Sequence, residues 1–341
     1  MTVTYFNSLK THVPDPNTDG YGRAARNIIE LMRELEWEEE NNEEQLYYFL
    51  FSTPPAIRSR ATQLKSQNRD CKLIGFTMWE TSRLPKGWKE GLDMLDLLLT
   101  PSEFCKDMFK NNGVKVPIEV MPIPLAIQDF PFVERDIKRS PFVFVQYANL
   151  TKRKGWHFTV DAFTQEFAFG EPVRLIFKSK VGVPLSFTDE RISLICEPWT
   201  QKQMTDLLHS ADVFVNPSMG EGFGLPDLES MATGCPPIST YAHALKEHLN
   251  DEIAYCIKDF QHVKVSYEDM AAWPEEFADN NNMGQWVKPN VTEIRCYMRQ
   301  AYRDRENNLE MGRRAAKYVR EHYTYYALKN RLSEILDLVA V

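Results

Sequence analysis

Short apolar runs alternate with amphipathic stretches along most of the chain. The runs are rich in β-branched and aromatic residues and occupy residues 3–6, 46–51, 73–78, 96–100 and 118–121, then 142–147, 173–178, 191–196, 213–215 and 237–239. Many of the stretches between them place apolar residues at helical spacing. This alternation predicts βαβ units and parallel sheets, so the expected fold class is α/β.

A proline-rich stretch divides the pattern into two halves. Pro122, Pro124 and Pro131 interrupt any regular element between residues 122 and 140, which predicts a linker. We therefore expect an N-terminal domain over residues 1–139 and a C-terminal domain over residues 140–323. Residues 324–341 predict a final amphipathic helix with Leu328 and Leu332 on its apolar face. Residues 255–286 predict an irregular insertion in the second half.

Composition narrows the class of protein. A length of 341 residues suits two domains, and a formal net charge of -8 argues against indiscriminate binding to nucleic acid. No apolar run approaches the ~18 residues of a membrane span, and the N-terminus lacks a secretory pattern, so a cytoplasmic location is expected. The cysteines are scattered without a C-x-x-C pair, which predicts reduced thiols and no thiolate zinc site.

The segment VFVNPSMGEGFGLPDLESMATG, residues 213–234, carries the most chemical information. It predicts a buried strand, a glycine loop, and a helix with Pro226 at its first position and Gly234 past its end. Backbone amides of such a loop at a helix N-terminus bind phosphate. Glu221 and Glu229 flank the loop. Because a phosphate would repel both carboxylates, we expect them to bind neutral hydroxyls, such as those of a sugar and a ribose.

This segment resembles the E-x7-E signature of the retaining GT-B glycosyltransferases of family 4. The resemblance implies that Glu221 contacts hydroxyls of the donor sugar and that Glu229 binds the nucleotide ribose. The diphosphate would be held by the backbone amides of Gly222, Phe223, Gly224 and Leu225. The implied fold has two Rossmann-like domains facing a cleft, with the C-terminal helix crossing back to the first domain. The alternative is that Glu221 only favours the helix dipole and Glu229 is a surface residue.

Residues 147–163 resemble the family segment in which a K-G pair opens a helix. The resemblance implies that Lys154 neutralises the leaving diphosphate, with Arg153 as the expected second cation and Lys152 as the next choice. The alternative is a loop of solvated basic residues.

Two segments of the first half also resemble the family. Gly20 and Gly22 in the sequence DGYGR resemble its first glycine loop, which implies a contact with the diphosphate. Residues 73–88 resemble a segment of the form E-x-x-R-L-P-x-x-W, in which Glu80 would orient sugar or acceptor hydroxyls and Arg83 would bind an anion. A local ion pair between Glu80 and Arg83 is the alternative.

The reaction that the resemblance implies is sugar transfer from a UDP- or GDP-linked donor to an acceptor hydroxyl, with retained anomeric configuration. The departing phosphate oxygen would accept the acceptor proton, although a covalent route stays open. The chain has no D-x-D motif, which fits a site that needs no metal cofactor and uses cationic side chains and a helix dipole instead.

The acceptor is not fixed by the sequence. Basic residues of the first half would suit an anionic acceptor, such as a membrane glycolipid, a polysaccharide or a modified DNA base, or they form a solvated face. Two other classes stay open, a GT-B sugar-nucleotide epimerase and a non-catalytic sugar-nucleotide sensor. The sequence gives no oligomeric state. The basic residues are Arg58, Arg60, Lys65, Arg69, Lys72, Lys106, Lys110 and Lys115.

Overall fold

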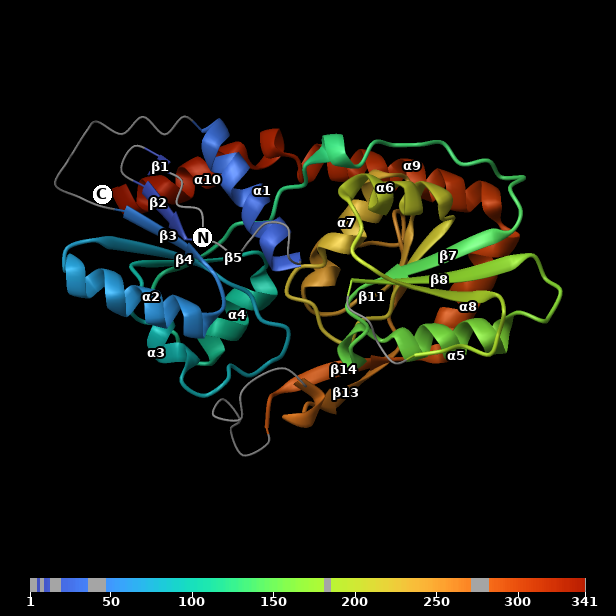
Figure 1. The fold of residues 1–341 in the computed structure, drawn as a ribbon, viewed down its shortest axis with the longest axis horizontal. Coiled ribbons are helices and arrows are strands. Elements are labelled where there is room, and N and C mark those ends of the chain that lie inside the picture. The colour runs from blue at the N-terminus through green and yellow to red at the C-terminus, as the bar shows by residue number, and fades with distance from the viewer. Residues whose placement is uncertain are drawn as a thin grey trace. The chain divides into compact units, whose positions relative to one another are not determined.

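The structure is a computed structural model that describes residues 5–6, 9–12, 20–35, 47–180, 185–270 and 282–340. Contacts divide the chain into two compact units (Figure 1). Unit 1 comprises Met1–Leu125, Lys264–Gln285 and Tyr323–Val341, and unit 2 comprises Ala126–Val263 and Trp286–His322. Each unit contains a largely parallel sheet with helices on both faces, so the predicted α/β class is confirmed.

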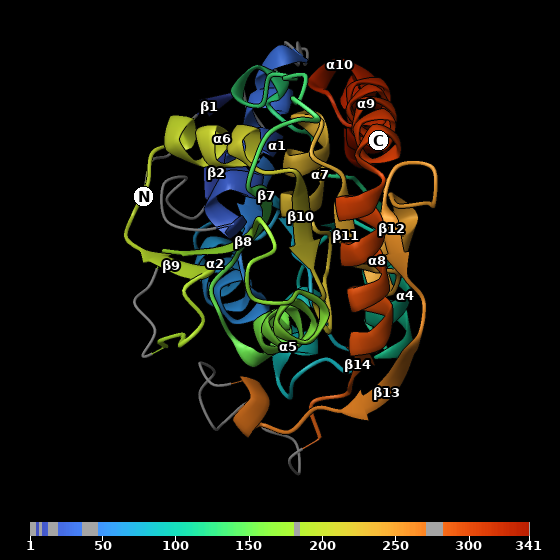
Figure 2. The same ribbon diagram turned by 90° about the vertical axis from the view of Figure 1, so that its right-hand side faces the viewer.

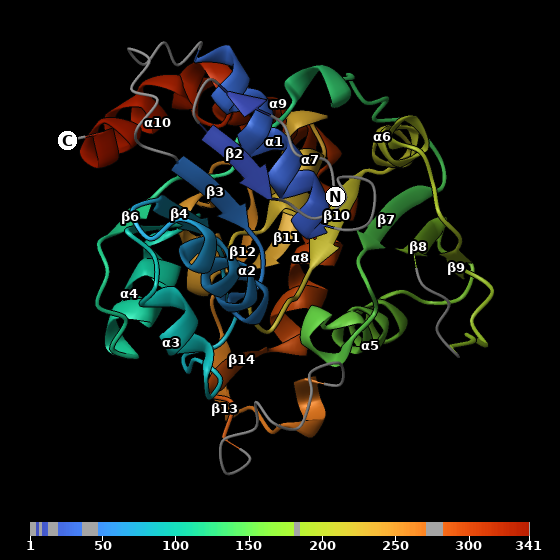
Figure 3. The ribbon, with the colours of Figure 1, turned by 60° about the vertical axis from the view of Figure 1, so that its left-hand side comes forward.

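The described part of unit 1 forms a six-stranded sheet in the order β1-β2-β3-β4-β5-β6. Its first two strands are antiparallel and the other neighbours are parallel. Figure 3 shows α1 and α10 on one face of this sheet and α2, α3 and α4 on the other. The elements are β1 (Tyr5–Phe6), β2 (Leu9–His12), α1 (Gly20–Glu34), β3 (Tyr47–Phe51), α2 (Pro54–Gln67), β4 (Lys72–Phe76), α3 (Trp88–Leu92), β5 (Leu97–Thr100), α4 (Glu103–Asn111), β6 (Ile118–Val120) and α10 (Tyr325–Ala340).

Burial explains why these elements form. Every residue of β3 and of β5 is buried, because helices cover both faces of the sheet. The final helix α10 packs against α1 and buries Leu332 and Ile335, which lie on the apolar face that the sequence predicts. The C-terminal helix therefore belongs to the core of the same unit as the N-terminal strands.

The described part of unit 2 forms a six-stranded parallel sheet in the order β12-β11-β10-β7-β8-β9, which can be followed across Figure 2. Helices α5 and α8 pack on one face and α7 and α9 on the other. The elements are η1 (Ile127–Asp129), β7 (Phe142–Tyr147), η2 (Lys152–Lys154), α5 (Trp156–Glu166), β8 (Val173–Ser179), β9 (Ile192–Cys196), α6 (Gln201–Ser210), β10 (Val213–Asn216), α7 (Leu225–Ala232), β11 (Pro237–Thr240), η3 (His243–Glu247), β12 (Tyr255–Ile257), α8 (Val291–Arg303) and α9 (Arg305–His322).

The predicted strands of both halves are present in the described residues, and β7 has the predicted bounds; residues 3 and 4 of the first predicted strand lie outside the described residues. The prediction of an irregular insertion over residues 255–286 is wrong at its start, because β12 pairs with β11 as the edge strand of the sheet of unit 2. Its three residues give too short an apolar run to be recognised. Strands β13 (Phe260–Lys264) and β14 (Gln285–Pro289) then form a separate two-stranded sheet, with η4 (Glu268–Met270) between them in sequence.

Candidate functional site

The strand order of unit 2 places two loops side by side. From β7 the chain builds β8 and β9 on one side, and it then returns to place β10, β11 and β12 on the other side. In doubly wound sheets, ligands bind at the carboxyl ends of the strands where this reversal occurs. Here the reversal lies between β7 and β10, so the candidate site is formed by the segments that follow these strands, residues 148–155 and 217–224.

Backbone contacts fix the two loops against each other. The amide of Met219 donates to the carbonyl oxygen of Arg153 at 2.7 Å. Gly155 has a φ of 64°, and a Cβ atom added to it would lie 2.1 Å from the carbonyl oxygen of Pro217. Only glycine fits here, because any side chain would separate the loops. This explains the K-G pair singled out in the sequence.

The loops bring Lys154, Arg153 and Glu221 together. The ammonium nitrogen of Lys154 lies 2.5 Å from Oε1 of Glu221. Nη1 of Arg153 lies 3.4 Å from Oε2 of Glu221 and donates to the carbonyl oxygen of Gly220 at 2.5 Å. Burial alone would raise the pKa of Glu221, but the two cations outweigh it and lower this pKa to about 2. Glu221 is therefore a buried carboxylate held ionised by two cations.

Helix α7 begins directly after this cluster. Gly224 precedes it with a φ of 97°, which an L side chain rarely adopts. Pro226 lies in the first turn, one position later than the sequence predicts, and its missing N–H costs nothing there. The first amides of any helix have no acceptor within the helix and carry a partial positive charge. Together with Lys154 and Arg153, they make this end of α7 electropositive.

Glu229 lies one turn further along α7 and is 2% exposed, so it is not a surface residue. Its Oε2 accepts a hydrogen bond of 2.5 Å from the hydroxyl of Tyr147, the last residue of β7. The same hydroxyl is 3.2 Å from the carbonyl oxygen of Pro226. Tyr147 thus orients Glu229 against the first turn of α7, a role that sequence reasoning missed.

Two further residues under the loop also escaped prediction. His248 is 2% exposed, and its ring centroid lies 5.5 Å from that of Phe223. Burial lowers its pKa to about 4, so the ring is neutral near pH 7. Asp227, in the first turn of α7, is completely buried. The sequence does not single out either residue, because each is one of several polar residues in its stretch and the pattern does not show which of them is buried.

In unit 1 the structure brings Gly20, Gly22 and the segment of Glu80 into one region. Both glycines lie in the first turn of α1 and not in a loop, so the expected loop conformation is wrong there. Tyr21, between them, approaches Thr77 and the carbonyl oxygen of Met78, each at 3.1 Å from its hydroxyl. Glu80 follows in the coil after β4 and is half-buried. Tyr21 therefore links the two segments.

The basic residues of unit 1 are partly neutralised by carboxylates. Lys65 and Lys72 lie 3.4 and 3.6 Å from the two carboxylate oxygens of Asp96. Lys106 lies 3.6 Å from Oε2 of Glu119. These surface pairs contribute little stability, but they lower the positive potential that an anionic acceptor would meet.

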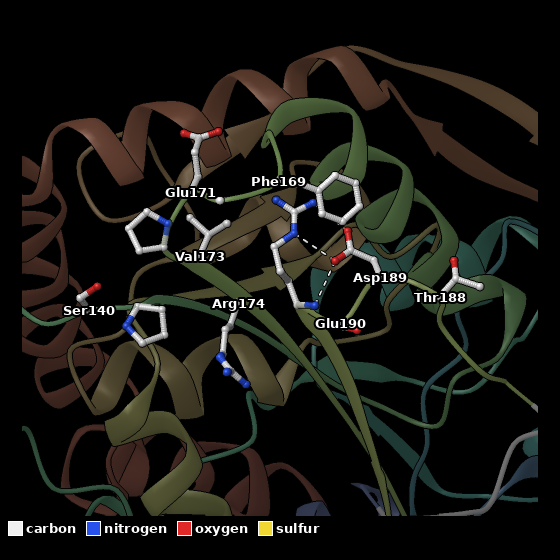
Figure 4. A pocket seen from close by; sticks show the side chains of 12 residues that line it. Ser140, Phe169, Glu171, Val173, Arg174, Thr188, Asp189 and Glu190 are labelled. Atoms are coloured by element: carbon white, nitrogen blue, oxygen red, sulfur yellow. Dashed lines mark hydrogen bonds and ion pairs between the residues drawn. The ribbon is translucent and has the colours of Figure 1, made fainter.

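A pocket of unit 2 lies at the opposite edge of its sheet. Figure 4 shows this pocket of about 540 Å³ at the amino ends of β7, β8 and β9. Arg191 forms an ion pair with Asp189 there and stacks on Phe169 at 4.8 Å. The pocket is therefore separate from the Glu221 cluster. Within the described ranges, we find no cluster of His, Cys, Asp or Glu arranged to hold a metal ion and no helix long and apolar enough to span a membrane.

Residues 141–273 match the family model described as "Glycosyl transferases group 1". The chain therefore carries a group 1 glycosyltransferase domain, which contains Lys154, Glu221 and Glu229, and this match supports a glycosyltransferase function. The match spans less than half of the chain. No curated protein matches the sequence.

Solved glycosyltransferase structures are similar to this chain over both of its units. Sucrose-phosphate synthase from Thermosynechococcus elongatus has a TM-score of 0.65 and 12% identity, covering 93% of this chain and 78% of that chain. A glycosyltransferase from Rickettsia africae has a TM-score of 0.62 and 14% identity, covering 92% and 79%. The pneumococcal O-GlcNAc transferase GtfA, solved with UDP and GlcNAc, has a TM-score of 0.57 and 14% identity, covering 86% and 57%. The chain thus spans little more than half of GtfA. The predicted GT-B fold class is confirmed.

Proposed function

We propose that this protein is a retaining glycosyltransferase of family 4, which moves a sugar from a nucleotide diphosphate sugar to an acceptor hydroxyl. One observation carries the proposal. The buried Glu221, paired with Lys154 and Arg153, lies beside the N-terminus of α7 at the strand reversal of unit 2. This arrangement offers cations and backbone amides for a diphosphate and carboxylates for hydroxyl groups.

We assign the donor contacts as follows. The amides of Gly222 to Leu225 hold the diphosphate at the N-terminus of α7. Glu221 accepts hydrogen bonds from hydroxyls of the sugar, and Glu229, oriented by Tyr147, accepts them from the ribose. The donor is UDP- or GDP-linked. The UDP bound in the GtfA structure supports the first of these.

The chemical step breaks the bond between the anomeric carbon and the phosphate oxygen. Negative charge then grows on the leaving diphosphate, and Lys154, Arg153 and the α7 amides stabilise it in place. The leaving phosphate oxygen takes the proton of the acceptor hydroxyl as that oxygen attacks the same face of the sugar. No separate base and no metal ion is required in this mechanism. Gly20, Gly22 and Glu80 of unit 1 are proposed to contact the diphosphate and the hydroxyls.

The acceptor is proposed only as a hydroxyl of a glycan, a lipid-linked saccharide or a modified DNA base. An epimerase would convert the donor with no acceptor present, and a sensor would bind the donor without turnover. Product analysis with the donor alone, and then with candidate acceptors, separates these outcomes. NMR of the product's anomeric proton checks retention, and activity in excess chelator checks metal independence.

The first test is thermal unfolding with a panel of UDP-, GDP- and ADP-sugars. A ligand at ~100 times its dissociation constant adds about 2.7 kcal/mol to the folded state. We expect stabilisation by at least one donor and its loss in Lys154→Ala and Glu229→Ala. The control is Lys202→Ala, whose side chain is 82% exposed on α6. Absence of stabilisation by every donor would overturn the proposal.

A further inference from the structure

Asp227 has a buried carboxyl group next to the proposed diphosphate site. It lies in the first turn of α7 with no solvent exposure. Its Oδ2 accepts a hydrogen bond of 2.6 Å from Nδ2 of Asn216, at the end of β10. Its Oδ1 accepts another from the hydroxyl of Ser239 in β11. Asp227 therefore connects the first turn of α7 to the two strands beneath it.

The hydrogen bonds around Asp227 suit both the charged and the neutral carboxyl group. In the charged state, Asn216 and Ser239 both donate to it. The hydroxyl of Ser239 is also 3.3 Å from the carbonyl oxygen of Asn216. If Oδ1 carries a proton, it can donate to Ser239, and Ser239 can turn to donate to that carbonyl oxygen. A change of protonation state leaves no buried group without a partner, so it needs no rearrangement of the backbone.

The groups around Asp227 shift its pKa in opposite directions. Burial raises its pKa most, and the negative charge of Glu221 raises it further, whereas Ser239, Asn216 and Lys154 lower it, with the result at about 7. His248, which directly follows η3, lies near the same turn, since Gly224 has both His248 Nε2 and Asp227 Oδ2 within 3.4 Å of its added Cβ position. The His248 ring is neutral near pH 7, because burial lowers its pKa to about 4.

We propose that Asp227 is a positioning residue that takes up a proton when the diphosphate of the donor binds at the N-terminus of α7. This inference rests on the proposed function. An ionised Asp227 is favoured by the helix N-terminus while the site lacks an anion, but it repels an arriving diphosphate. Protonation removes that repulsion and keeps α7 attached to β10 and β11. Donor affinity then depends on pH through a residue that does not touch the donor.

The test measures the dissociation constant of UDP-glucose by calorimetry as a function of pH. UDP is unsuitable, because a terminal phosphate itself titrates near pH ~6. If donor binding requires Asp227 to be protonated and its pKa in the free protein is about 7, the affinity falls by about 20- to 30-fold between about pH 6.5 and about pH 8.5. Calorimetry in two buffers of different ionisation heat counts the protons that the wild-type protein takes up. GDP-mannose replaces UDP-glucose if only that donor binds.

Asp227→Asn is the decisive variant, because its amide mimics the neutral acid and can donate to Ser239. We expect it to bind UDP-glucose at high pH as tightly as the wild type does at low pH, without proton uptake. Ser239→Ala removes a donor to the carboxylate, so it shifts the midpoint of the pH dependence upward. It provides the test if Asp227→Asn does not fold. The matched control is Asp212→Asn, a buried carboxylate at the other end of β10, which should keep the wild-type pH dependence.

The outcomes separate the two proposals. If no nucleotide sugar binds at any pH, the proposed function fails. If UDP-glucose binds with an affinity that does not change with pH, or if Asp227→Asn keeps the wild-type proton uptake, the proposed function stands and the role of Asp227 is overturned.

Discussion

The ammonium nitrogen of Lys154 lies 2.5 Å from a carboxylate oxygen of Glu221, although 67 residues separate them in the sequence. Glu221 is buried and Lys154 is partly buried, and their ion pair joins the loop after β7 to the loop after β10. The positive charge of Lys154 and the lowered pKa of Glu221 are the basis of the first two predictions.

Replacement of Lys154 by alanine should reduce the rate of transfer strongly. The variant removes a cation that is proposed to stabilise the developing charge of the leaving diphosphate, and we expect this loss to lower kcat by about 100- to 1000-fold. Lys152→Ala is the matched control, because Lys152 lies in the same turn η2 but is exposed. The measurement is initial rates with a saturating donor. Equal losses in both variants would show that only the net charge of the turn matters.

The stability of the protein should depend on pH through Glu221. The two cations lower the pKa of Glu221 from 4.5 to about 2 in the folded state, so its stabilising effect is fully present above pH 4.5 and is lost as pH falls toward 2. The shift corresponds to about 3 kcal/mol. Urea unfolding of the wild type and of Glu221→Gln should show their difference in unfolding free energy shrinking over this range. A constant difference would contradict the ionised pair.

Replacement of Gly155 by alanine should separate the two loops. The added Cβ would lie 2.1 Å from the carbonyl oxygen of Pro217, so the backbone must move. Gly170→Ala is the control, because Gly170 also has a positive φ of 98° but has nothing within 4 Å of its added Cβ. We expect a loss of about 1 kcal/mol for the control and of about 3 kcal/mol for Gly155→Ala. Only Gly155→Ala should weaken donor binding in a thermal-shift titration.

Replacement of Tyr147 by phenylalanine should weaken donor binding with little change in kcat. The variant removes the hydrogen bond that orients Glu229, and such a bond contributes about 0.5–1.5 kcal/mol. We expect the donor KM to rise about tenfold. Tyr255→Phe removes another buried hydroxyl of the same sheet, which is 3.2 Å from Asn308, and should leave KM unchanged. A fall in kcat alone would contradict the assignment of Glu229 to the ribose.

The sequence predicted the parts of this protein whose signal is local. Continuous apolar runs identify β7 and β10, and the glycine loop before Pro226 identifies the start of α7. The resemblance also selected Lys154 and Glu221, which the structure brings together. These features depend on residues that are close together in the chain, so the spacing of residue types in the sequence is enough to predict them.

The missed features depend on contacts between distant residues. Tyr147 reaches Glu229 across 82 positions, and Ser239 reaches Asp227 from the next strand. A strand pattern shows that Tyr147 and Ser239 are buried, but it does not show which neighbour their hydroxyls meet. The loop predicted at Gly20 and Gly22 is wrong for a related reason. The contacts of Tyr21 with Thr77 and Met78 also join distant residues, and they hold this turn within α1.

The strand order of unit 2 also has a consequence for how the protein folds. Strand β10 pairs with β7 only after the chain has built β8, β9 and α6, so the contact between Lys154 and Glu221 closes a long loop. Contacts of such large sequence separation form late and slowly. In a nascent chain that ends before β10, Lys154 and Arg153 are present without their carboxylate partner Glu221. Binding of a nucleotide sugar would therefore report that this unit has completed its folding.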